Sequence, residues 1–206
     1  MEPLELSIAI NTYKSPELLR LCLESIDRFM PKSGLHYEVL VVDSATEEVT
    51  EMLMREEFPH VRFLPFKENV GFKSLINTSL DEAKGEYVFL INGDIILTEG
   101  AVPELLAYIK NHPDIGILGP KQFNFNGSIQ QSFFRFYKPV TILYRRTFLG
   151  RFAFAKKHLA WFAMEEVGDP KEPIPAEWVI GSALFVKRQT ALEVGYMDNR
   201  FFMYME

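Results

Sequence analysis

The stretch YVFLINGDIIL, residues 87–97, sets the expected fold of this 206-residue chain. It opens as an apolar run, is interrupted by the triplet NGD at residues 92–94, and then becomes apolar again. This pattern predicts a buried strand that ends in a polar turn. A carboxylate between Ile91 and Ile95 is costly if it is desolvated without a partner. Asp94 therefore either caps a simple turn or faces a solvated, functional cleft.

The same pattern of buried strands and amphipathic helices runs outward from this stretch. Strands are expected at residues 6–10, 37–42, 61–65 and 115–118, and helices at 16–29, 47–57, 73–83 and 101–111. Gly85 follows the third helix and is expected to end it as a glycine just past a helix does. Short connections and strands that are apolar on both faces favour a mostly parallel, Rossmann-like α/β sheet flanked by helices.

Three polar residues stand at the carboxyl ends of these strands: Asn11, Asp43 and Asp94. Ligands of such sheets bind outside the carboxyl ends of the strands, so the three are expected on one rim. Mg²⁺ and Mn²⁺ take one or two carboxylates plus substrate phosphate oxygens, and Asp94 could supply such a carboxylate. Asp43 either accepts hydrogen bonds from a base or ribose or caps the helix that follows it.

Several other chemistries lack their motifs in this sequence. There is no glycine-rich dinucleotide turn after the first strand, no GxxxxGK[ST] loop, and no HExxH or CxxC pattern. The single cysteine, Cys22, lies among leucines, which predicts a core position and favours a reducing compartment. No signal pattern and no uncharged apolar run long enough to cross a bilayer occurs, so a cytoplasmic location is expected.

The charge is distributed unevenly along the chain. Between Ile115 and Met164 there are eight basic residues and no acidic ones, which leaves 14 basic against 28 acidic residues elsewhere. A basic lobe on an acidic protein predicts an anionic partner such as a diphosphate or an anionic membrane, or else is only a solvated face. Residues 138–164 mix basic residues with aromatic ones and predict one or two amphipathic helices. The basic, aromatic region 135–161 either contacts the inner face of a membrane or forms an ordinary acceptor-side helix.

The remainder of the second half is less regular. We expect a loop or hairpin at residues 123–135, an extended loop at 165–175, a strand at 178–186 and a short helix at 188–194. No nucleic-acid partner is expected.

Five segments, in this order, carry a family resemblance. They are LSIAINTYKSPELLRLCLESI from residue 6, VVDSA from 41, NVGFKSLINTSLDEAKGEYVFLINGDIIL from 69, EWVIGSALFVKR from 177 and DNRFFMYME from 198. The chain resembles the family 2 glycosyltransferases of the GT-A fold, above all their rhamnosyltransferase-like branch. The resemblance implies metal-assisted, inverting transfer of a sugar from a nucleoside diphosphate donor to a hydroxyl of a saccharide or lipid-linked acceptor. Mn²⁺ or Mg²⁺ would be the cofactor, and cell envelope polysaccharide biosynthesis the setting.

The resemblance also implies roles for particular residues. Residues 1–120 would bind the donor, and residues 121–206 would form the acceptor-side half of the same domain. The implied nucleotide-binding residues are Asn11, Thr12, Tyr13, Asp43, Asn69, Gly71 and Asn92. Asp94 would hold the metal in the NGD triplet, where the family has its DxD-like site. The implied sugar and acceptor residues are Trp178, Gly181 and Ser182.

The catalytic base implied by the resemblance falls at the end of the sequence. In the family it is an Asp that directly follows an acidic residue in FFMYxED, and this sequence ends at Glu206, where that Asp would come next. Either the chain is a C-terminally truncated form of a longer protein, which we expect, or Glu206 substitutes as the catalytic residue. The alternative function is a nucleotide-sugar binding module without turnover.

Overall fold

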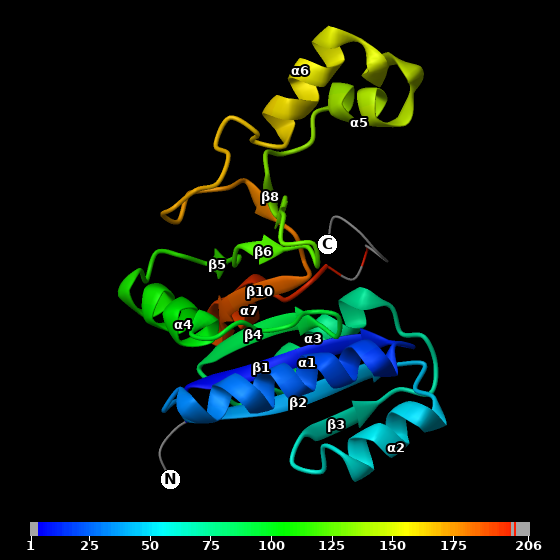
Figure 1. Ribbon diagram of the computed structural model, residues 1–206, viewed down its shortest axis with the longest axis vertical. Helices are drawn as coiled ribbons and strands as arrows, with labels where there is room; N and C mark the ends of the chain where they lie inside the picture. Colours follow the sequence, from blue (N-terminus) through cyan, green and yellow to red (C-terminus); the bar gives the residue numbers. More distant parts are fainter. Residues whose placement is uncertain (1–3, 199, 201–206) are drawn as a thin grey trace. The chain divides into compact units, whose positions relative to one another are not determined.

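The computed structural model describes residues 4–198 and 200, which fall into two compact units (Figure 1). The first unit runs to Leu118 and resumes at Ser182, and the second is Gly119–Gly181. The sequence analysis divided the chain near residue 120, close to the first boundary. It did not predict that the chain rejoins the first unit at Ser182. That the two halves act as one domain stays a prediction.

A six-stranded sheet forms the centre of the first unit. Its strands are β1 (Leu6–Tyr13), β2 (Tyr37–Ser44), β3 (Arg62–Pro65), β4 (Tyr87–Asn92), β5 (Ile117–Leu118) and β10 (Ala183–Lys187). They lie in the order β3-β2-β1-β4-β10-β5. The pairs among β3, β2, β1 and β4 are parallel, and β10 runs antiparallel to β4 and β5. The predicted α/β fold with a mostly parallel sheet is therefore confirmed.

Helices cover this sheet: α1 (Pro16–Phe29) followed by the short η1 (Met30–Lys32), α2 (Glu48–Glu56), α3 (Phe72–Glu82), α4 (Ala101–Asn111) and α7 (Arg188–Val194). The sequence explains α1 well, because Pro16 occupies its first turn beside Glu17, and Arg28 lies in its last turn. No helix within the described residues is long and apolar enough to cross a membrane.

The two faces of β1 serve different helices. Ile8 and Ile10 belong to a buried apolar cluster with Leu23 of α1, and α1 crosses in front of β1 in Figure 1. Asn11 points to the opposite face, since strand residues alternate, and there it meets Ser79 of α3. Cys22 of α1 is fully buried, as predicted, and burial raises the pKa of its thiol to about 12.

The second unit contains two small two-stranded sheets and a helical hairpin. Strand β6 (Gln122–Phe123) pairs with β7 (Ile129–Gln130), and β8 (Phe133–Phe134) pairs with β9 (Trp178–Val179). The helices are α5 (Pro139–Arg146) and α6 (Ala153–Phe162), joined by the 3-10 turn η2 (Phe148–Arg151). The hairpin predicted within residues 123–135 and the pair of helices predicted within 138–164 are confirmed.

The single strand predicted at residues 178–186 is wrong. The structure has two strands there, β9 and β10, in different sheets. Ile180 still donates its N–H to the Ser132 carbonyl in the second unit at 2.9 Å, and the chain then leaves for the first unit at Ser182. Both strands are apolar, so periodicity alone could not separate them; Gly181 marks the break.

Gly85 has a different role from the predicted one. It does not adopt a positive φ, and α3 ends through Ala83 in extended backbone. A side chain at Gly85 would place its Cβ 2.5 Å from the Leu6 carbonyl carbon and the Ser7 nitrogen. The Gly85 N–H also donates to the Ser7 hydroxyl at 2.8 Å. Glycine is required because two backbones touch here.

We expect Gly85→Ala to lower the free energy of unfolding by about 1–3 kcal/mol, since backbone atoms must shift to admit the new methyl group. Urea denaturation measures this change. Gly116→Ala is the matched control, because nothing lies within 4 Å of its Cβ position. Equal stability of the two variants would contradict the close-approach explanation.

Candidate active site

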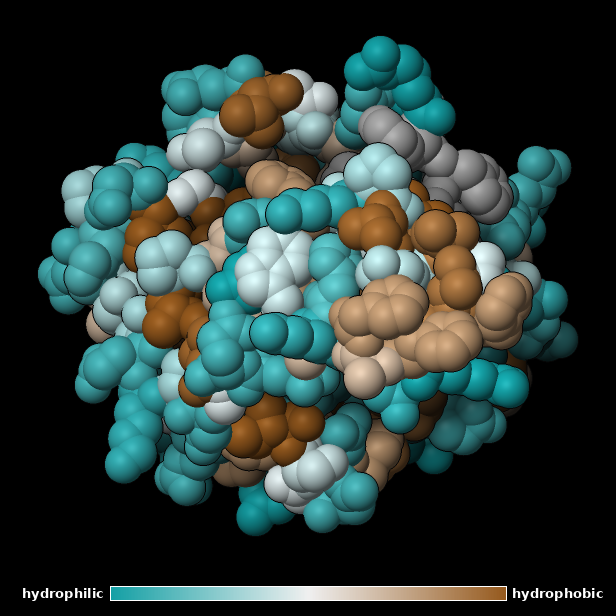
Figure 2. Space-filling model, turned by 90° about the horizontal axis from the view of Figure 1, so that it is seen from above, coloured by the Kyte–Doolittle hydropathy of each residue, from teal (hydrophilic) through white to brown (hydrophobic). Residues whose placement is uncertain are grey.

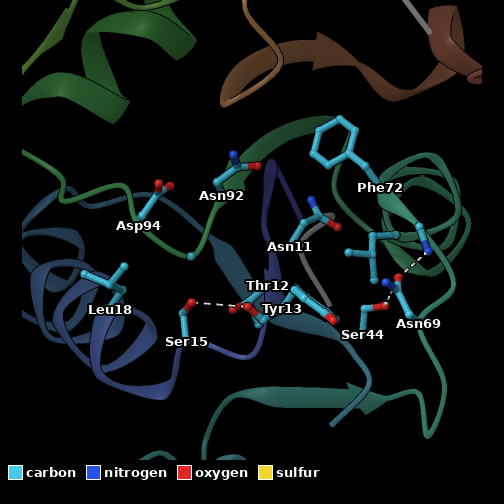
Figure 3. A pocket seen from close by; sticks show the side chains of 13 residues that line it. Asn11, Thr12, Tyr13, Ser15, Leu18, Ser44, Asn69, Phe72, Asn92 and Asp94 are labelled. Atoms are coloured by element: carbon cyan, nitrogen blue, oxygen red, sulfur yellow. Dashed lines mark hydrogen bonds between the residues drawn. The ribbon is translucent and has the colours of Figure 1, made fainter. Parts of the chain in front are cut away.

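The order of the strands creates a cleft beside β1. From β1 the chain crosses to β2 and β3 on one side and to β4 on the other, and ligands of open α/β sheets bind where the order reverses. A cavity of about 290 Å³ opens at the carboxyl ends of these strands (Figure 3). Its lining residues are Asn11, Thr12, Tyr13, Ser15, Leu18, Ser44, Asn69, Gly71, Phe72, Leu75, Asn92, Gly93 and Asp94.

The NGD triplet after β4 forms one wall of the cavity. The turn is closed by the main chain, since the Ile95 N–H donates to the Asn92 carbonyl at 3.1 Å. Asp94 is therefore not needed to close the turn; it is exposed and lines the cavity. Figure 3 shows Asn92 and Asp94 projecting to the same side. The solvated-cleft interpretation of Asp94 is the one that agrees with this geometry.

Gly93 fixes this turn against β1. Its N–H donates to the Asn11 carbonyl at 2.9 Å, and a Cβ at Gly93 would lie 2.9 Å from both Cβ and Oγ1 of Thr12. The absence of a side chain therefore allows the end of β4 to approach the end of β1. The sequence singled out the neighbours of Gly93 but gave it no role in the site.

Asn11 presents an unsatisfied hydrogen-bond donor. Its side chain is only 4% exposed and its Oδ1 accepts from the Ser79 hydroxyl at 2.8 Å. Its Nδ2 has no partner among the described residues. Asn11 lies between Asn92 and Phe72 in Figure 3. Buried polar groups normally find partners, so this amide is available to a ligand with acceptor oxygens.

Asp43 is buried beside the cavity rather than in its wall. It is 1% exposed and stands in register with Thr12 across the β1–β2 pair. Neither carboxylate oxygen makes a hydrogen bond of ordinary geometry with the described residues. Burial raises the pKa of this carboxyl, and nearby Thr46 and the Ser44 N–H oppose the shift only in part. The helix-cap alternative is wrong, because Glu47 is the N-cap of α2 and no side chain caps it.

Hydrogen bonds between Ser44 and residues 69–71 hold the wall of the cavity opposite Asp94. The Ser44 hydroxyl accepts from the Val70 N–H at 3.0 Å and donates to Asn69 Oδ1 at 3.3 Å. The same Asn69 oxygen accepts from the Gly71 N–H at 3.0 Å. Gly71 has φ of +76°, a conformation that favours glycine, and directly precedes α3. Asn69 and Gly71 therefore present the start of α3 to the cavity. That they bind the nucleotide stays a prediction.

The start of α3 favours an anion at this wall. The first N–H groups of a helix lack partners within the helix, and no side chain caps α3. The helix dipole adds partial positive charge at this end. Phe72 and Leu75 of α3 line the cavity, so a ligand there meets this end of the helix.

The predicted sugar and acceptor residues divide between the units. Ser182 directly precedes β10 and lies beside the end of β4, where its carbonyl accepts from the Asn92 N–H at 2.9 Å. Trp178 belongs to the second unit, where its ring stacks on Phe134 with centroids 4.4 Å apart and its Nε1 donates to the Arg135 carbonyl. Gly181 ends that unit. The roles of these three residues stay predictions.

The residues that could hold a metal are Asp94 and Asn92. No group of three or more His, Cys, Asp or Glu side chains that could hold a metal occurs within residues 4–198 and 200. One exposed carboxylate beside an amide does not suit a metal held by protein alone. It does suit Mg²⁺ or Mn²⁺ that also takes phosphate oxygens from a ligand. Glu206, the predicted catalytic residue, lies outside the described residues.

The segment after α7, residues 196–198, lies along one face of α3, and we call these contacts the α3 track. Tyr196 donates its hydroxyl to Asp81 at 2.5 Å, and Asn77 pairs with both main-chain polar groups of Met197 at 3.0 and 3.2 Å. Arg200 and, more weakly, Lys73 lower the pKa of Asp198 to about 2.

The three α3 positions of this track, 73, 77 and 81, are spaced four apart and share one face of the helix. Residues 196–198 meet them in reverse order. The chain therefore runs toward the end of α3 that lines the cavity.

Sequence reasoning missed six lining residues and this track. The missed lining residues are Ser15, Leu18, Ser44, Phe72, Leu75 and Gly93. Ser44, Phe72 and Gly93 each neighbour a predicted residue, which was the available signal. Asn77 gave no signal, because a polar residue on the outer face of a helix is ordinary; only its long-range contact with Met197 reveals it.

We expect Asp43→Asn to raise the free energy of unfolding at neutral pH by about 1 kcal/mol, because an ionised, unpaired carboxylate leaves the interior. The pKa of Asp43 in the folded state lies above its ordinary value of 3.8. The wild type therefore loses stability as pH rises from 3.8 through the folded-state pKa. The stability gained by Asp43→Asn should shrink as pH falls toward 3.8. Thermal melts across pH measure it, with the exposed Asp114→Asn as control. A loss of stability at neutral pH would contradict the assignment.

We expect Asn77→Ala to speed hydrogen exchange of the Met197 amide roughly 5- to 30-fold, since two hydrogen bonds of about 1 kcal/mol each hold this segment. Thr78→Ala, one position along α3, is the control. If both variants leave exchange unchanged, Asn77 does not hold the track.

The chain is similar in sequence to known glycosyltransferases. The profile of the family described as Glycosyl transferase family 2 matches residues 7–163. The chain is 29% identical over 199 residues to N-acetylglucosaminyl-diphospho-decaprenol L-rhamnosyltransferase of Mycobacterium tuberculosis. That match covers 88% of this chain and 63% of the relative. The chain thus spans less than two thirds of the length of that protein.

Solved structures agree with the fold. Mannosyltransferase PcManGT from Pyrobaculum calidifontis, in complex with GDP-Man and Mn²⁺, matches 96% of this chain and 48% of its own, with a TM-score of 0.60 and 17% identity. Staphylococcus aureus TarS 1-349 matches 98% of this chain and 52% of its own, with a TM-score of 0.62 and 16% identity. These likenesses show the GT-A fold. Because the family profile matches most of its length, the chain belongs to glycosyl transferase family 2.

Proposed function

We propose that this chain carries the donor site of an inverting glycosyltransferase, which moves a sugar from a nucleoside diphosphate to a hydroxyl of its acceptor. One observation carries the proposal: the switch-point cavity brings together the unpartnered amide of Asn11, the exposed carboxylate of Asp94 and the uncapped start of α3. These are a donor, a metal ligand and a partial positive charge, as a diphosphate requires. The family membership supports it, as does the GDP-Man in the structural neighbour.

Different residues of the rim bind the base, the ribose and the diphosphate of the donor. The exposed ring of Tyr13 offers a face to the base. Asp43 lies just behind the cavity wall, in register with Thr12, and its unpaired oxygens accept hydrogen bonds from a base or ribose that enters there. Asn11 Nδ2 and the start of α3 donate to the diphosphate. Ligand hydrogen bonds at Asn11 and Asp43 would then satisfy the polar atoms that the protein leaves unpaired.

Asp94 and Asn92 are the residues that would hold Mn²⁺ or Mg²⁺. When bound, the cation neutralises negative charge on the diphosphate and so makes it a better leaving group. Asp94 is exposed and lines the cavity, so a cation can reach its carboxylate from the solvent. Because the site supplies a single carboxylate, the protein binds the cation well only together with a diphosphate.

The transfer itself is a single displacement. The acceptor hydroxyl oxygen forms a bond to the anomeric carbon, while the bond from that carbon to the diphosphate oxygen breaks. The electron pair leaves with the diphosphate, and the hydroxyl proton passes to a base. Attack opposite the leaving group inverts the anomeric centre. The residues of this cavity favour the charge that grows on the diphosphate in the transition state.

The acceptor is a saccharide or a lipid-linked saccharide, in cell envelope polysaccharide synthesis. The relative from Mycobacterium tuberculosis is named for a diphospho-decaprenol acceptor. We place the activity in the cytoplasm, with which the buried free thiol of Cys22 agrees. Residues 135–161 would contact the inner face of the membrane. Release of nucleoside diphosphate in the presence of a sugar donor and acceptor separates this function from that of a binding module without turnover.

We expect Asp94→Asn to abolish the dependence of nucleoside diphosphate affinity on Mn²⁺ while leaving metal-free affinity nearly unchanged. In the wild type, Mn²⁺ should tighten nucleotide binding roughly 5- to 150-fold, the usual range of coupling between two bound ligands. Isothermal titration calorimetry with and without Mn²⁺ measures both values. Mn²⁺ without nucleotide should bind only weakly.

Two matched variants sharpen this measurement. Asp43→Asn should weaken binding with and without Mn²⁺ alike, because it removes a contact to the base or ribose. Asp114→Asn, an exposed carboxylate outside the lining residues, should leave all values unchanged. If Asp94→Asn retains the full Mn²⁺ effect, Asp94 is not the metal ligand.

A further inference from the structure

The helical hairpin of the second unit carries an apolar surface that the protein leaves open. Ile142, Leu143, Phe148, Phe152 and Phe154 are all exposed, and together we call them the α5–α6 tip. Phe148 is 69% and Phe154 58% exposed, which is high for such large apolar side chains. Figure 2, seen from above, shows a group of hydrophobic side chains right of centre with hydrophilic ones around it, besides other hydrophobic side chains elsewhere on this face.

The phenylalanine rings of the tip are connected to one another rather than scattered. Phe152 stacks on Phe154 with centroids 5.7 Å apart and an interplanar angle of 6°. Phe148 meets Phe152 edge to face at 6.5 Å, and Tyr144 meets Phe154 at 5.7 Å. Single exposed apolar residues need no explanation, but a contiguous patch marks an interaction surface.

The tip has a fixed framework beneath it. Thr141 of α5 is fully buried and its hydroxyl lies 2.7 Å from Nε2 of His158 on α6. Gly150 in η2 packs so closely that a Cβ there would overlap the Tyr144 carbonyl. The Thr147 hydroxyl donates to the Leu143 carbonyl at 2.7 Å. The two helices and their turn therefore present the aromatic rings in a set arrangement.

Unpaired cations accompany the tip. Arg146, Arg151, Lys156 and Lys157 are exposed, and none of them forms a salt bridge within the described part of the chain. No acidic residue occurs between Ile115 and Met164 to neutralise them. The surface thus combines apolar side chains that leave water readily with charges that require anions.

We propose that the α5–α6 tip docks onto an anionic lipid bilayer. Phenylalanine and aliphatic side chains enter the boundary between headgroups and acyl chains, while lysine and arginine meet lipid phosphates. A second copy of this chain is disfavoured as the occupant, because a twofold contact would bring these cations against one another. Docking does not depend on the proposed transfer reaction. Where the acceptor is lipid-linked, docking holds the enzyme at the surface that carries it.

Vesicle co-sedimentation tests this proposal. The wild type should bind vesicles of phosphatidylcholine mixed with phosphatidylglycerol and bind phosphatidylcholine alone much more weakly. Binding should fall as salt is raised, because salt screens the cations. Phe148→Ser with Phe152→Ser should weaken binding at least about tenfold. Arg151→Gln and Lys156→Gln should each weaken it roughly fivefold.

Matched controls come from the same unit. Phe125→Ser changes an exposed phenylalanine in the turn between β6 and β7, and Lys171→Gln an exposed lysine outside the tip. Both should bind vesicles as the wild type does. All these positions are exposed, so thermal melts should show that each variant folds.

Equal binding to both kinds of vesicle, or full binding by the tip variants, would overturn the proposal. So would lipid-free dimerisation that the phenylalanine variants abolish, since it would assign the tip to a second copy. Calorimetry with nucleoside diphosphate should be unchanged in the tip variants. Failure of vesicle binding and failure of nucleotide binding are thus seen in separate measurements.

Discussion

The parallel pairing of β1 with β4 is the constraint on which the candidate site depends. It sets Asn11 opposite Asn92 in register, at the point where the strand order reverses. The glycine at position 93 lets the turn after β4 close against Thr12, with its N–H bonded to the Asn11 carbonyl. One residue later, the chain presents Asp94 to the cavity. A shift of register by one residue would turn each of these side chains to the opposite face.

The same rim carries groups that weaken the fold in the absence of a ligand. Asp43 is buried without hydrogen bonds to its carboxylate, and Asn11 keeps an unpaired amide nitrogen. Each unsatisfied buried group costs free energy that the apolar strands around it must offset. Proteins tolerate such groups where a ligand completes them, and stability is often lost at binding sites for this reason. The surrounding strands are almost wholly buried, which leaves the fold able to carry this cost.

The second unit uses its aromatic residues in two ways. The Trp178 side chain makes its contacts inside the unit: it stacks on Phe134, and its indole N–H donates to the Arg135 carbonyl. Lys138 lies over the Trp161 ring at 4.2 Å. The aromatic residues of the α5–α6 tip, by contrast, remain exposed. Exposed apolar rings beside unpaired cations are the combination that the proposed bilayer contact requires.

The sequence by itself determined the four parallel strands and the helices of the first unit, because strongly apolar runs and helix-start signals such as Pro16 depend only on neighbouring residues. It also placed Asn11, Asp43 and Asp94 at strand ends. Only the tertiary structure decided that Asp43 lies buried beside the cavity, that Gly85 is needed for a backbone contact, and that residues 178–186 divide between two sheets. These features arise from contacts between segments far apart in the chain, and local patterns carry no record of such contacts.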